Sequence, residues 1–427
     1  MKGLILAAPS SGAGKTTITL ALLRWLSRNG IAVRAAKSGP DYIDPKFHEA
    51  ACGQTCLNLD AWAMSPDRLR MLAGGEVPLI IEGAMGLFDG APPDGRGAVA
   101  DLARLLDLPV LLIVDAGRMA QSVAPLVAGF AGHDPQVRVA GVILNNVGSA
   151  RHAGMLRHAL APLGLPVLAV MPRSPDLAMP SRHLGLVQAG ERSDLDLFLD
   201  HAADRLAAGV DGDIPPGLDR ILDLAAPLPD ASDGPSLLPP AQRIALARDE
   251  AFAFSYPHML ADWHAQGAEI LPFSPLADDP VPEADFVFLP GGYPELHAPR
   301  IAAASRFLDT LRSHAQSRPV YGECGGYMVL GESLTDADGT SHAMAGLLQL
   351  ATSFEKRRLH LGYRRLTAQA GPFSGPHMAH EFHYATTLYA DGTPLFEAWD
   401  ATDTALPPMG LRKGHVSGSF AHVIDRA

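Results

Sequence analysis

The sequence predicts an α/β protein made of two doubly wound domains. In the first half, short apolar runs rich in β-branched residues alternate with longer amphipathic stretches. This pattern is typical of parallel strands separated by helices. A stretch rich in Pro, Asp and Gly follows at residues 211–242, and beyond it the alternation begins again. A chain of 427 residues is also long enough for two or three domains.

The individual elements can be placed along the chain. A strand is expected at residues 3–8 and a helix at 14–28, which the Asn29-Gly30 pair ends. Further strands of the first half are expected at 31–37, 78–82, 110–114, 137–144 and 167–170. After the proline-rich stretch, strands are expected at 243–248, 284–290 and 319–322. We therefore predict domains at 1–210 and 243–427, joined by a linker at 211–242.

Composition excludes several classes of protein. Hydrophobic residues make up 47% and charged residues 19%, which is ordinary for a folded chain and wrong for a disordered one. The net charge of -12 argues against a general nucleic-acid binder. The odd count of three cysteines suits a reducing compartment. The apolar run at the N-terminus is too short to span a bilayer, so we expect a soluble, cytoplasmic protein without membrane contact.

A phosphate-binding loop occupies residues 10–17, between the first strand and the first helix. Backbone N–H groups of such a loop and the positive end of the helix cradle phosphate. Lys15 is expected to reach the terminal phosphates of ATP, and the Thr16 hydroxyl to ligate Mg²⁺. The strict motif has Gly where this chain has Pro9. The loop residues expected to bind ATP are Ser11, Gly12, Gly14, Lys15, Thr16 and Thr17.

Acidic residues at the carboxyl ends of strands are candidates for holding the metal. Glu82 lies in IIEGAMGLFDG and Asp41 in KSGPDYIDP, and both are expected at the edge of the sheet where ligands bind. Asp115, which ends LLIVDA, is a third candidate, although a helix cap or a solvated loop would explain it equally well.

The second domain carries a candidate nucleophile. Cys324 lies in YGECGGY, between a strand and a helix, where the helix N-terminus is expected to lower the pKa of the thiol. His422 in GSFAH is the candidate base. The amides of Gly292, in LPGGY, and of Gly325 could form an oxyanion hole.

A metal site on the HMAHEFHY segment is an alternative use of its histidines. His377, His380 and His383 are spaced three apart and would share one face only in a helix, which Pro376 and the aromatic residues disfavour. Cys52 and Cys56 have no further thiol partner for zinc.

The chain resembles the cobyrinic acid a,c-diamide synthases, the glutamine-dependent amidotransferases of corrin biosynthesis, some of which act on hydrogenobyrinic acid. The resemblance covers nearly the whole chain. It rests on the phosphate loop and on the segments KSGPDYIDPKFH, NLDAW, EGAMGLFDG, RHLGLV, PGGYPE, YGECGGYMVLG, HEFHY and GSFAH.

The resemblance implies an N-terminal domain similar to dethiobiotin synthetase and a C-terminal class I glutaminase domain. The matching positions imply that Lys15 and Thr16 bind ATP and Mg²⁺, that Asp41 and Glu82 hold the metal or the activated carboxylate, and that Asn145 contacts adenine. Cys324 and His422 would be the glutaminase pair. Glutamine, ATP and a corrinoid or related tetrapyrrole acid would be the substrates, and a homodimer is conceivable. Macrocycle contacts are expected at Tyr42, Asp44, Arg182 and His183.

One feature departs from the broader class I glutaminases, which place a glutamate two residues after the histidine. This chain has Val423 and Ile424 there, so the carboxylate that would orient His422 is expected to be absent.

Three alternatives remain open. The macrocycle could be metal-free, cobalt-bearing or, as in Ni-sirohydrochlorin a,c-diamide synthase, nickel-bearing, and cobyric acid synthase is a related amidoligase. An excess of arginine over lysine, as in high-GC genomes, favours hydrogenobyrinate slightly. The alternative from another class is a partition-type ATPase switch, but such proteins carry an early lysine in the loop, where this chain has Ser10.

Overall fold

A computed structural model describes residues 2–179, 181–182, 185–210, 217–218, 220–230, 234 and 236–427. The chain divides into two compact units, Met1–Gly234 and Pro235–Ala427. No helix in these ranges is both long and apolar enough to cross a membrane.

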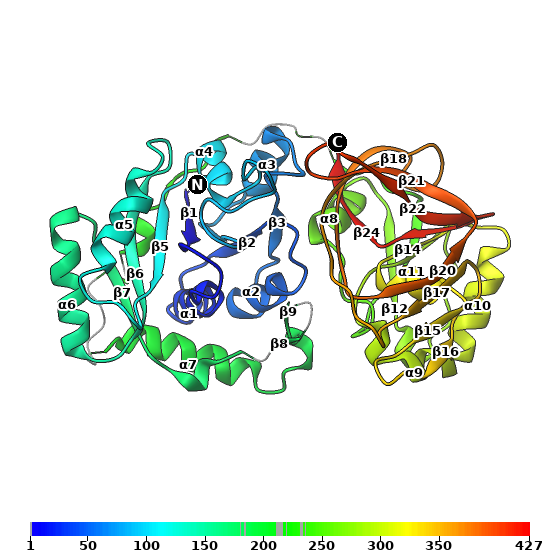
Figure 1. The fold of residues 1–427 in the computed structure, drawn as a ribbon, viewed down its shortest axis with the longest axis horizontal. Coiled ribbons are helices and arrows are strands. Elements are labelled where there is room, and N and C mark those ends of the chain that lie inside the picture. Colours follow the sequence, from blue (N-terminus) through cyan, green and yellow to red (C-terminus); the bar gives the residue numbers. More distant parts are fainter. Residues whose placement is uncertain are drawn as a thin grey trace. The chain divides into compact units, whose positions relative to one another are not determined.

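The first unit is built on a parallel sheet, as its continuous apolar strands predict. In spatial order its strands are β3 (Leu57–Leu59), β2 (Arg34–Ser38), β4 (Leu79–Glu82), β1 (Lys2–Ala7), β5 (Val110–Asp115), β6 (Val139–Val147) and β7 (Val167–Pro172) (Figure 1). The strand expected at residue 31 begins only at Arg34, because the N–H of Ile31 still bonds to the Leu26 carbonyl at the end of the preceding helix.

Helices connect these strands. Those of the first unit are α1 (Lys15–Arg28), α2 (Asp44–Cys52), α3 (Pro66–Ala73), α4 (Val99–Leu106), α5 (Val123–Gly132), α6 (Ala150–Leu160) and α7 (Leu195–Ala208). Helix α1 packs against α2 and α7, and ion pairs such as Arg24–Asp200 join α1 to α7. The short strands β8 (Ser181–Arg182) and β9 (Gly185–Leu186) form a hairpin before α7.

Part of the segment expected to be a linker belongs to the first unit. Strand β10 (Ala226–Pro227) pairs antiparallel with the start of β1. Leu218 and Ile221, just before it, are fully buried. The first unit therefore extends beyond residue 210, because these two apolar side chains add to its core.

The second unit combines a parallel half-sheet with an antiparallel extension. Its ten-stranded sheet has the order β12 (Glu269–Phe273), β11 (Arg243–Ala247), β13 (Phe286–Leu289), β14 (Val320–Glu323), β23 (Val416–Ser419), β22 (Ala405–Lys413), β21 (Thr393–Trp399), β18 (His360–Ala368), β19 (Gly375–His383) and β24 (Ala421–Arg426). The first five are parallel neighbours and the last five pair antiparallel. The antiparallel part was not predicted.

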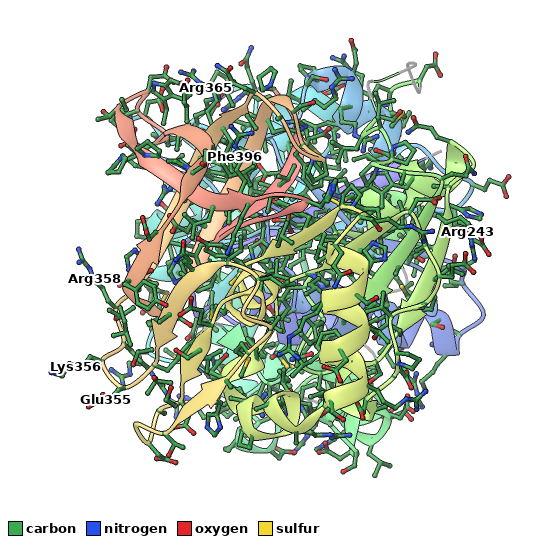
Figure 2. All side chains as sticks on the ribbon, turned by 90° about the vertical axis from the view of Figure 1, so that its right-hand side faces the viewer. Arg243, Glu355, Lys356, Arg358, Arg365 and Phe396 are labelled. Atoms are coloured by element: carbon green, nitrogen blue, oxygen red, sulfur yellow. The ribbon has the colours of Figure 1, made fainter. Side chains whose placement is uncertain are left out.

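Smaller elements complete the second unit. A four-stranded sheet contains β16 (Ser341–Ala343), β15 (Ser333–Thr335), β17 (Gln349–Ser353) and β20 (Thr386–Asp391). The helices are α8 (Pro257–Ala265), α9 (Ala298–Ala303), α10 (Ser305–Ala315) and α11 (Gly325–Leu330). Glu355, Lys356 and Arg358 project into solvent from the loop between β17 and β18 (Figure 2).

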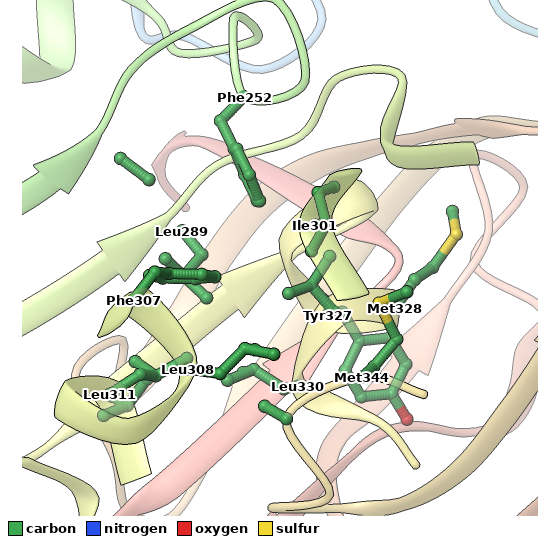
Figure 3. Packing of buried hydrophobic residues seen from close by; sticks show 14 of the residues in the cluster. Phe252, Leu289, Ile301, Phe307, Leu308, Leu311, Tyr327, Met328, Leu330 and Met344 are labelled. Atoms are coloured by element: carbon green, nitrogen blue, oxygen red, sulfur yellow. The ribbon is translucent and has the colours of Figure 1, made fainter. Parts of the chain in front are cut away.

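The core of the second unit lies between the parallel strands and helices α9, α10 and α11. It is a continuous cluster of buried apolar side chains (Figure 3). Its members include Leu289, Ile301, Phe307, Leu308, Leu311, Tyr327, Met328 and Leu330. This core holds β13, β14 and α11 together, and these elements carry the candidate nucleophile and the Gly-Gly loop.

We expect Phe307→Ala to lower the free energy of unfolding of the second unit by about 3–5 kcal/mol, because Phe307 is fully buried and its removal leaves a cavity. Hydrogen exchange in increasing urea, read on peptides from β13 and β14, measures the change in this unit alone. Leu388→Ala is the matched control, because Leu388 is 59% exposed. Equal effects of the two substitutions would contradict the assignment of this core.

Candidate active sites

The phosphate loop joins the end of β1 to the start of α1, as predicted. Gly14 precedes the helix with a φ of 88°, and Gly12 has a φ of 79°, both in the left-handed region that favours glycine. A Cβ atom at Gly14 would also lie 2.1 Å from the side-chain nitrogen of Asn145. The loop therefore requires glycine at position 14 on two counts.

A cavity of about 400 Å³ opens at this loop. It brings together most of the residues predicted for ATP, metal and substrate. These are Ser11, Gly12, Gly14, Lys15, Thr16, Thr17, Asp41, Asp44 and Glu82. Lys37, Gly83, Ala84, Met85 and Met179 complete the lining.

Lys15 folds back over the loop. Its ammonium donates to the carbonyl of Ser10 at 3.2 Å and to the carbonyl of Met85. Burial lowers the pKa of Lys15, against the opposing attraction of Glu82. A phosphate oxygen at this place would be a stronger acceptor than either carbonyl.

A compact cluster of charged groups lies behind Lys15. The Thr16 hydroxyl donates to Glu82 at 2.8 Å, and the Lys37 ammonium contacts Glu82 at 2.7 Å and Asp44 at 2.5 Å. Burial alone would raise the pKa of Glu82, but Lys37 and then His48 hold it well below its usual value. The two carboxylates likewise raise the pKa of Lys37 against the effect of burial. Lys37 and Glu82 are therefore both charged at neutral pH.

Lys37 was missed as a site residue, although it stands in the motif KSGPDYIDP. The sequence feature that could have revealed it is a lysine near the end of an otherwise apolar strand. Lys37 is only 3% exposed, and a buried ammonium requires partners of opposite charge.

His48 supports Glu82 from the side of α2. Its Nε2 lies 2.5 Å from Glu82 Oε2, and its Nδ1 lies 3.5 Å from the sulfur of Cys56. His48, Glu82 and Cys56 are all fully buried. These contacts fix one oxygen of Glu82 and leave the other directed at Thr16 and Lys37.

Asp41, predicted to hold the metal with Thr16 and Glu82, lines the same cavity as these two residues. One of its oxygens accepts the backbone N–H groups of Ile43 and Asp44, which open α2. Burial and repulsion by Asp44 raise the pKa of Asp41 to about 6. Asp44, which was predicted to contact the macrocycle, lies 3.3 Å from the Thr16 hydroxyl, so it is a second carboxylate beside Glu82.

The other predicted residues of the first unit have varied surroundings. Asn145 donates to the Ala13 carbonyl at 2.9 Å and so supports the loop. The Arg182 guanidinium donates two hydrogen bonds of 2.6 Å to the carboxylate of Glu191. Asp115 is exposed and accepts the N–H of Gly117 at 2.9 Å, in the loop that follows β5. Tyr42 is buried, and His183 lies outside the described residues.

Cys324 lies on a tight turn between β14 and α11. Its φ of 46° is unusual for a residue with a side chain, and such strain is typical of functional turns. The turn is held because the Cys324 N–H donates to the Ser419 carbonyl at 2.8 Å. A Cβ atom at Gly326 would lie 1.9 Å from the Leu289 carbonyl oxygen, so this position must be glycine.

The Gly-Gly segment after β13 brings His422 and Cys324 together. A Cβ atom added to Gly291 would lie 2.3 Å from Cε1 of His422 and 3.3 Å from Cβ of Cys324. A Cβ atom added to Gly325 would lie 3.1 Å from the amide nitrogen of Gly292. The thiol, the imidazole and the two predicted oxyanion amides therefore meet at one place.

The expected lowering of the Cys324 pKa is wrong. The thiol is 1% exposed, and burial, followed by the negative charge of Glu295, raises its pKa well above the ordinary value. The N–H of Gly325 opposes this shift but does not outweigh it. Helix α11 has only six residues, so its dipole is small.

The expected absence of a carboxylate beside His422 is also wrong. Val423 and Ile424 are buried apolar residues, as the sequence shows. However, Oε2 of Glu323, the residue before the nucleophile, lies 3.4 Å from Nδ1 of His422.

The three histidines of HMAHEFHY do not share a face. They lie on strand β19, where side chains alternate between the two faces, so His380 points away from His377 and His383. Within the described residues, metal-ligating atoms converge at His360, Glu381 and His383 instead.

That second cluster has the features of an ion-pair network. Glu381 accepts from Arg364 at 2.7 Å and contacts His383 at 3.0 Å. Burial would raise the pKa of Glu381, but His383 and Arg364 lower it to about 2. The rings of His360 and His383 are stacked with their centroids 4.6 Å apart, so their in-plane nitrogen lone pairs lie in parallel planes.

Comparisons with known proteins cover both units. The CobQ/CobB/MinD/ParA nucleotide binding domain matches residues 4–187, and the CobB/CobQ-like glutamine amidotransferase domain matches residues 243–426. The predicted fold class, a nucleotide-binding α/β domain followed by a glutamine amidotransferase domain, is thereby confirmed.

Several full-length relatives share one name. Proteins named hydrogenobyrinate a,c-diamide synthase from Brucella anthropi and Rhizobium meliloti are 54% and 53% identical over 434 residues, covering 100% of this chain and 99% of theirs. The protein of that name from Rhodobacter capsulatus is 53% identical and covers 99% of this chain and 98% of its own. By these matches the chain belongs to the family of hydrogenobyrinate a,c-diamide synthases, which are glutamine-dependent amidotransferases.

Proposed function

We propose that this chain uses ATP and glutamine to convert the a and c side-chain carboxylates of hydrogenobyrinic acid into amides, with cobyrinic acid as the alternative substrate. The observation that carries the proposal is the presence of two complete sites in one chain. One is a phosphate loop backed by buried carboxylates, and the other is a cysteine and a histidine beside two glycine amides. The name shared by the full-length relatives supports the metal-free macrocycle.

In the second unit, the reaction begins at Cys324. The thiol proton passes to Nε2 of His422 while the sulfur attacks the side-chain carbonyl carbon of glutamine. The amides of Gly292 and Gly325 stabilise the oxyanion. The imidazolium returns its proton to the leaving nitrogen, ammonia departs, and water hydrolyses the thioester to glutamate and the free thiol.

In the first unit, ATP activates the acceptor. A free carboxylate is a poor acyl donor, so a side-chain carboxylate of the macrocycle attacks the γ-phosphorus and ADP leaves. Ammonia then displaces phosphate from the acyl phosphate and forms the amide. Lys15 and Lys37 stabilise the negative charge of the transferred phosphoryl group. The same steps at a second side chain produce the diamide.

The oxygen donors of the first site fit a magnesium ion. Thr16, Asp44 and Glu82 present a hydroxyl and two carboxylates, the hard ligands that Mg²⁺ prefers. We propose that these three hold it, with Asp41 at the edge of the same cavity. When bound, the ion would neutralise phosphate charge.

The free, buried state of all three cysteines supports a reducing, cytoplasmic location.

Mass spectrometry of the product tests the proposed reaction. The protein is incubated with ATP, Mg²⁺ and glutamine, with hydrogenobyrinic acid, cobyrinic acid and nickel sirohydrochlorin offered separately. We expect two carboxyl-to-amide changes on hydrogenobyrinic acid. If ATP and glutamine were consumed but only nickel sirohydrochlorin were amidated, the substrate would be nickel sirohydrochlorin and not hydrogenobyrinic acid. Absence of glutaminase activity altogether would instead indicate a nucleotide switch.

Cys324→Ala should abolish glutamine-dependent amidation, by about 10⁴-fold or more, because the thioester cannot form. Amidation from added ammonium chloride should persist, because the first site is unchanged. Cys52→Ala, a substitution at a buried cysteine of the first unit, is the control and should retain both activities. Intact use of glutamine by Cys324→Ala would contradict the assignment of the nucleophile.

Lys15→Ala should lower the rate of amidation from either nitrogen source by about 100- to 1000-fold. The reason is that the transferred phosphoryl group loses the Lys15 ammonium, which donates hydrogen bonds to its negatively charged oxygens. Glutaminase activity should be largely retained. Both rates are measured by product mass spectrometry and glutamate release. Lys46→Ala is the control, because Lys46 is paired on the surface with Glu49. Loss of glutaminase activity together with amidation would overturn the division of labour between the two units.

Without substrate, Cys324 should react slowly with iodoacetamide at pH 7. Its pKa is raised, so the thiol form dominates at neutral pH and the rate should increase only as pH rises above the ordinary cysteine value. Alkylation is followed by peptide mass spectrometry between pH 6 and pH 10, with free N-acetylcysteine as the reference. If the pH at which the alkylation rate is half-maximal lay below that of the reference, the positive charge of His422 would outweigh the effect of burial on the Cys324 pKa.

A further inference from the structure

Glu323 places a buried carboxylate beside the catalytic histidine. It is the last residue of β14 and immediately precedes Cys324. Its Oε2 lies 3.4 Å from Nδ1 of His422, and its Oε1 accepts the N–H of Val423 at 3.1 Å. The side chains of Glu323 and His422 are 2% and 1% exposed. One carboxylate thus contacts both the imidazole and the backbone next to it.

The backbone explains how this contact arises. Glu323 pairs with Ser419 in the parallel ladder between β14 and β23, and β24 begins two residues later at Ala421. The glutamate side chain therefore needs to reach only the neighbouring segment. The same pairing places the Cys324 N–H on the Ser419 carbonyl. The pairing of β14 with β23 thus positions the nucleophile and the acid, and the histidine follows three residues after Ser419 on β24.

The other charged groups around the histidine are engaged differently. Glu381 is held by Arg364 and His383. His380 lies opposite His422 in the antiparallel ladder between β19 and β24, and it carries no negative charge. Glu295 acts on Cys324 as a negative charge. The carboxylate of Glu323, in contrast, lies within ion-pair distance of Nδ1 of His422, at 3.4 Å.

We propose that Glu323 is the positioning residue of the glutaminase site, which holds the His422 imidazole with a proton on Nδ1 and Nε2 directed at Cys324. The inference rests on the proposed glutaminase reaction. The ring edge with Cε1 and Nε2 faces Gly291, whose other neighbour is Cβ of Cys324. Nδ1, on the side toward Glu323, keeps its proton throughout, while Nε2 receives the thiol proton and returns it to the departing ammonia. Glu323 stays ionised and stabilises the imidazolium between these two transfers.

This arrangement replaces the acid two residues after the histidine with one directly before the nucleophile. Positions 423 and 424 are free to be apolar because the orienting charge comes from β14. A burial argument points the same way: a carboxylate with 2% exposure requires compensating partners, and its partners here are one backbone N–H and one imidazole.

Glu323→Gln separates the orienting role from a structural one. The amide oxygen of glutamine can still accept the N–H of Val423, whereas the negative charge at Nδ1 is lost. We expect the glutamine-dependent kcat to fall by about 100-fold or more, with KM for glutamine within about threefold of the wild type. Glu323→Asp, which keeps the charge on a shorter side chain, should recover part of the loss. Glu269→Gln is the matched control, because Glu269 is 58% exposed in its pair with Arg243.

Two further readouts make the outcome decisive. Amidation from ammonium chloride should be unchanged in Glu323→Gln, which shows that the chain is folded and that the proposed synthetase reaction stands. In wild-type protein labelled with [¹⁵N]histidine, the His422 signal, identified by its loss in His422→Gln, should show the proton on Nδ1. The tautomer is read on the wild-type protein, so this measurement does not depend on whether Glu323→Gln folds.

A kcat of Glu323→Gln within about twofold of the wild type would overturn the inference, as would a neutral His422 with its proton on Nε2. If the wild type releases no ammonia from glutamine at all, the proposed function fails instead. The two failures are therefore distinguishable.

Discussion

The tight turn between a parallel strand and the helix that follows it is the constraint on which both sites depend. In the first unit the turn from β1 to α1 needs a left-handed backbone at Gly14, which presents loop amides and Lys15 to one cavity. In the second unit the turn from β14 to α11 forces Cys324 itself to a φ of 46°. Parallel strands place such turns at one edge of each sheet, so residues at or just after the ends of neighbouring strands gather there as well, such as Glu82 in the first unit and Gly291 in the second.

The two sites use burial in opposite ways. In the first, Lys37, Asp44 and Glu82 are buried together, and their mutual attraction outweighs desolvation, so the lysine and Glu82 remain charged. In the second, Cys324 is buried with negative rather than positive groups acting on it, and its thiol is favoured over the thiolate. The first site is thus organised for a highly charged phosphate. The second depends on His422 to accept the thiol proton during the reaction.

Much of the first site was readable from the sequence because it is local. The loop, the helix after it and the strand-end acid Glu82 lie where the motif predicts them, within one cavity. Asp41 and Asp44 are three residues apart in one turn, and the sequence does not reveal which of them faces Thr16. Backbone N–H groups at the start of α2 occupy one oxygen of Asp41, and this leaves Asp44 for the cluster. His48 and Cys56 were not predicted, because their contacts depend on how α2 packs against the sheet.

The sequence by itself determined the α/β class, the phosphate loop and the nucleophile turn, because glycines and strand-helix periodicity report local backbone geometry. Only the tertiary structure decided the electrostatics. The direction of the Cys324 pKa shift follows from burial in a core made of distant elements, and the carboxylate beside His422 comes from a residue 99 positions earlier, as the two residue numbers show. The antiparallel strands that carry His380, Glu381 and Arg364 were likewise beyond prediction. Long-range strand pairing is the physical reason: it sets the contacts between residues far apart in the chain, and no local pattern records it.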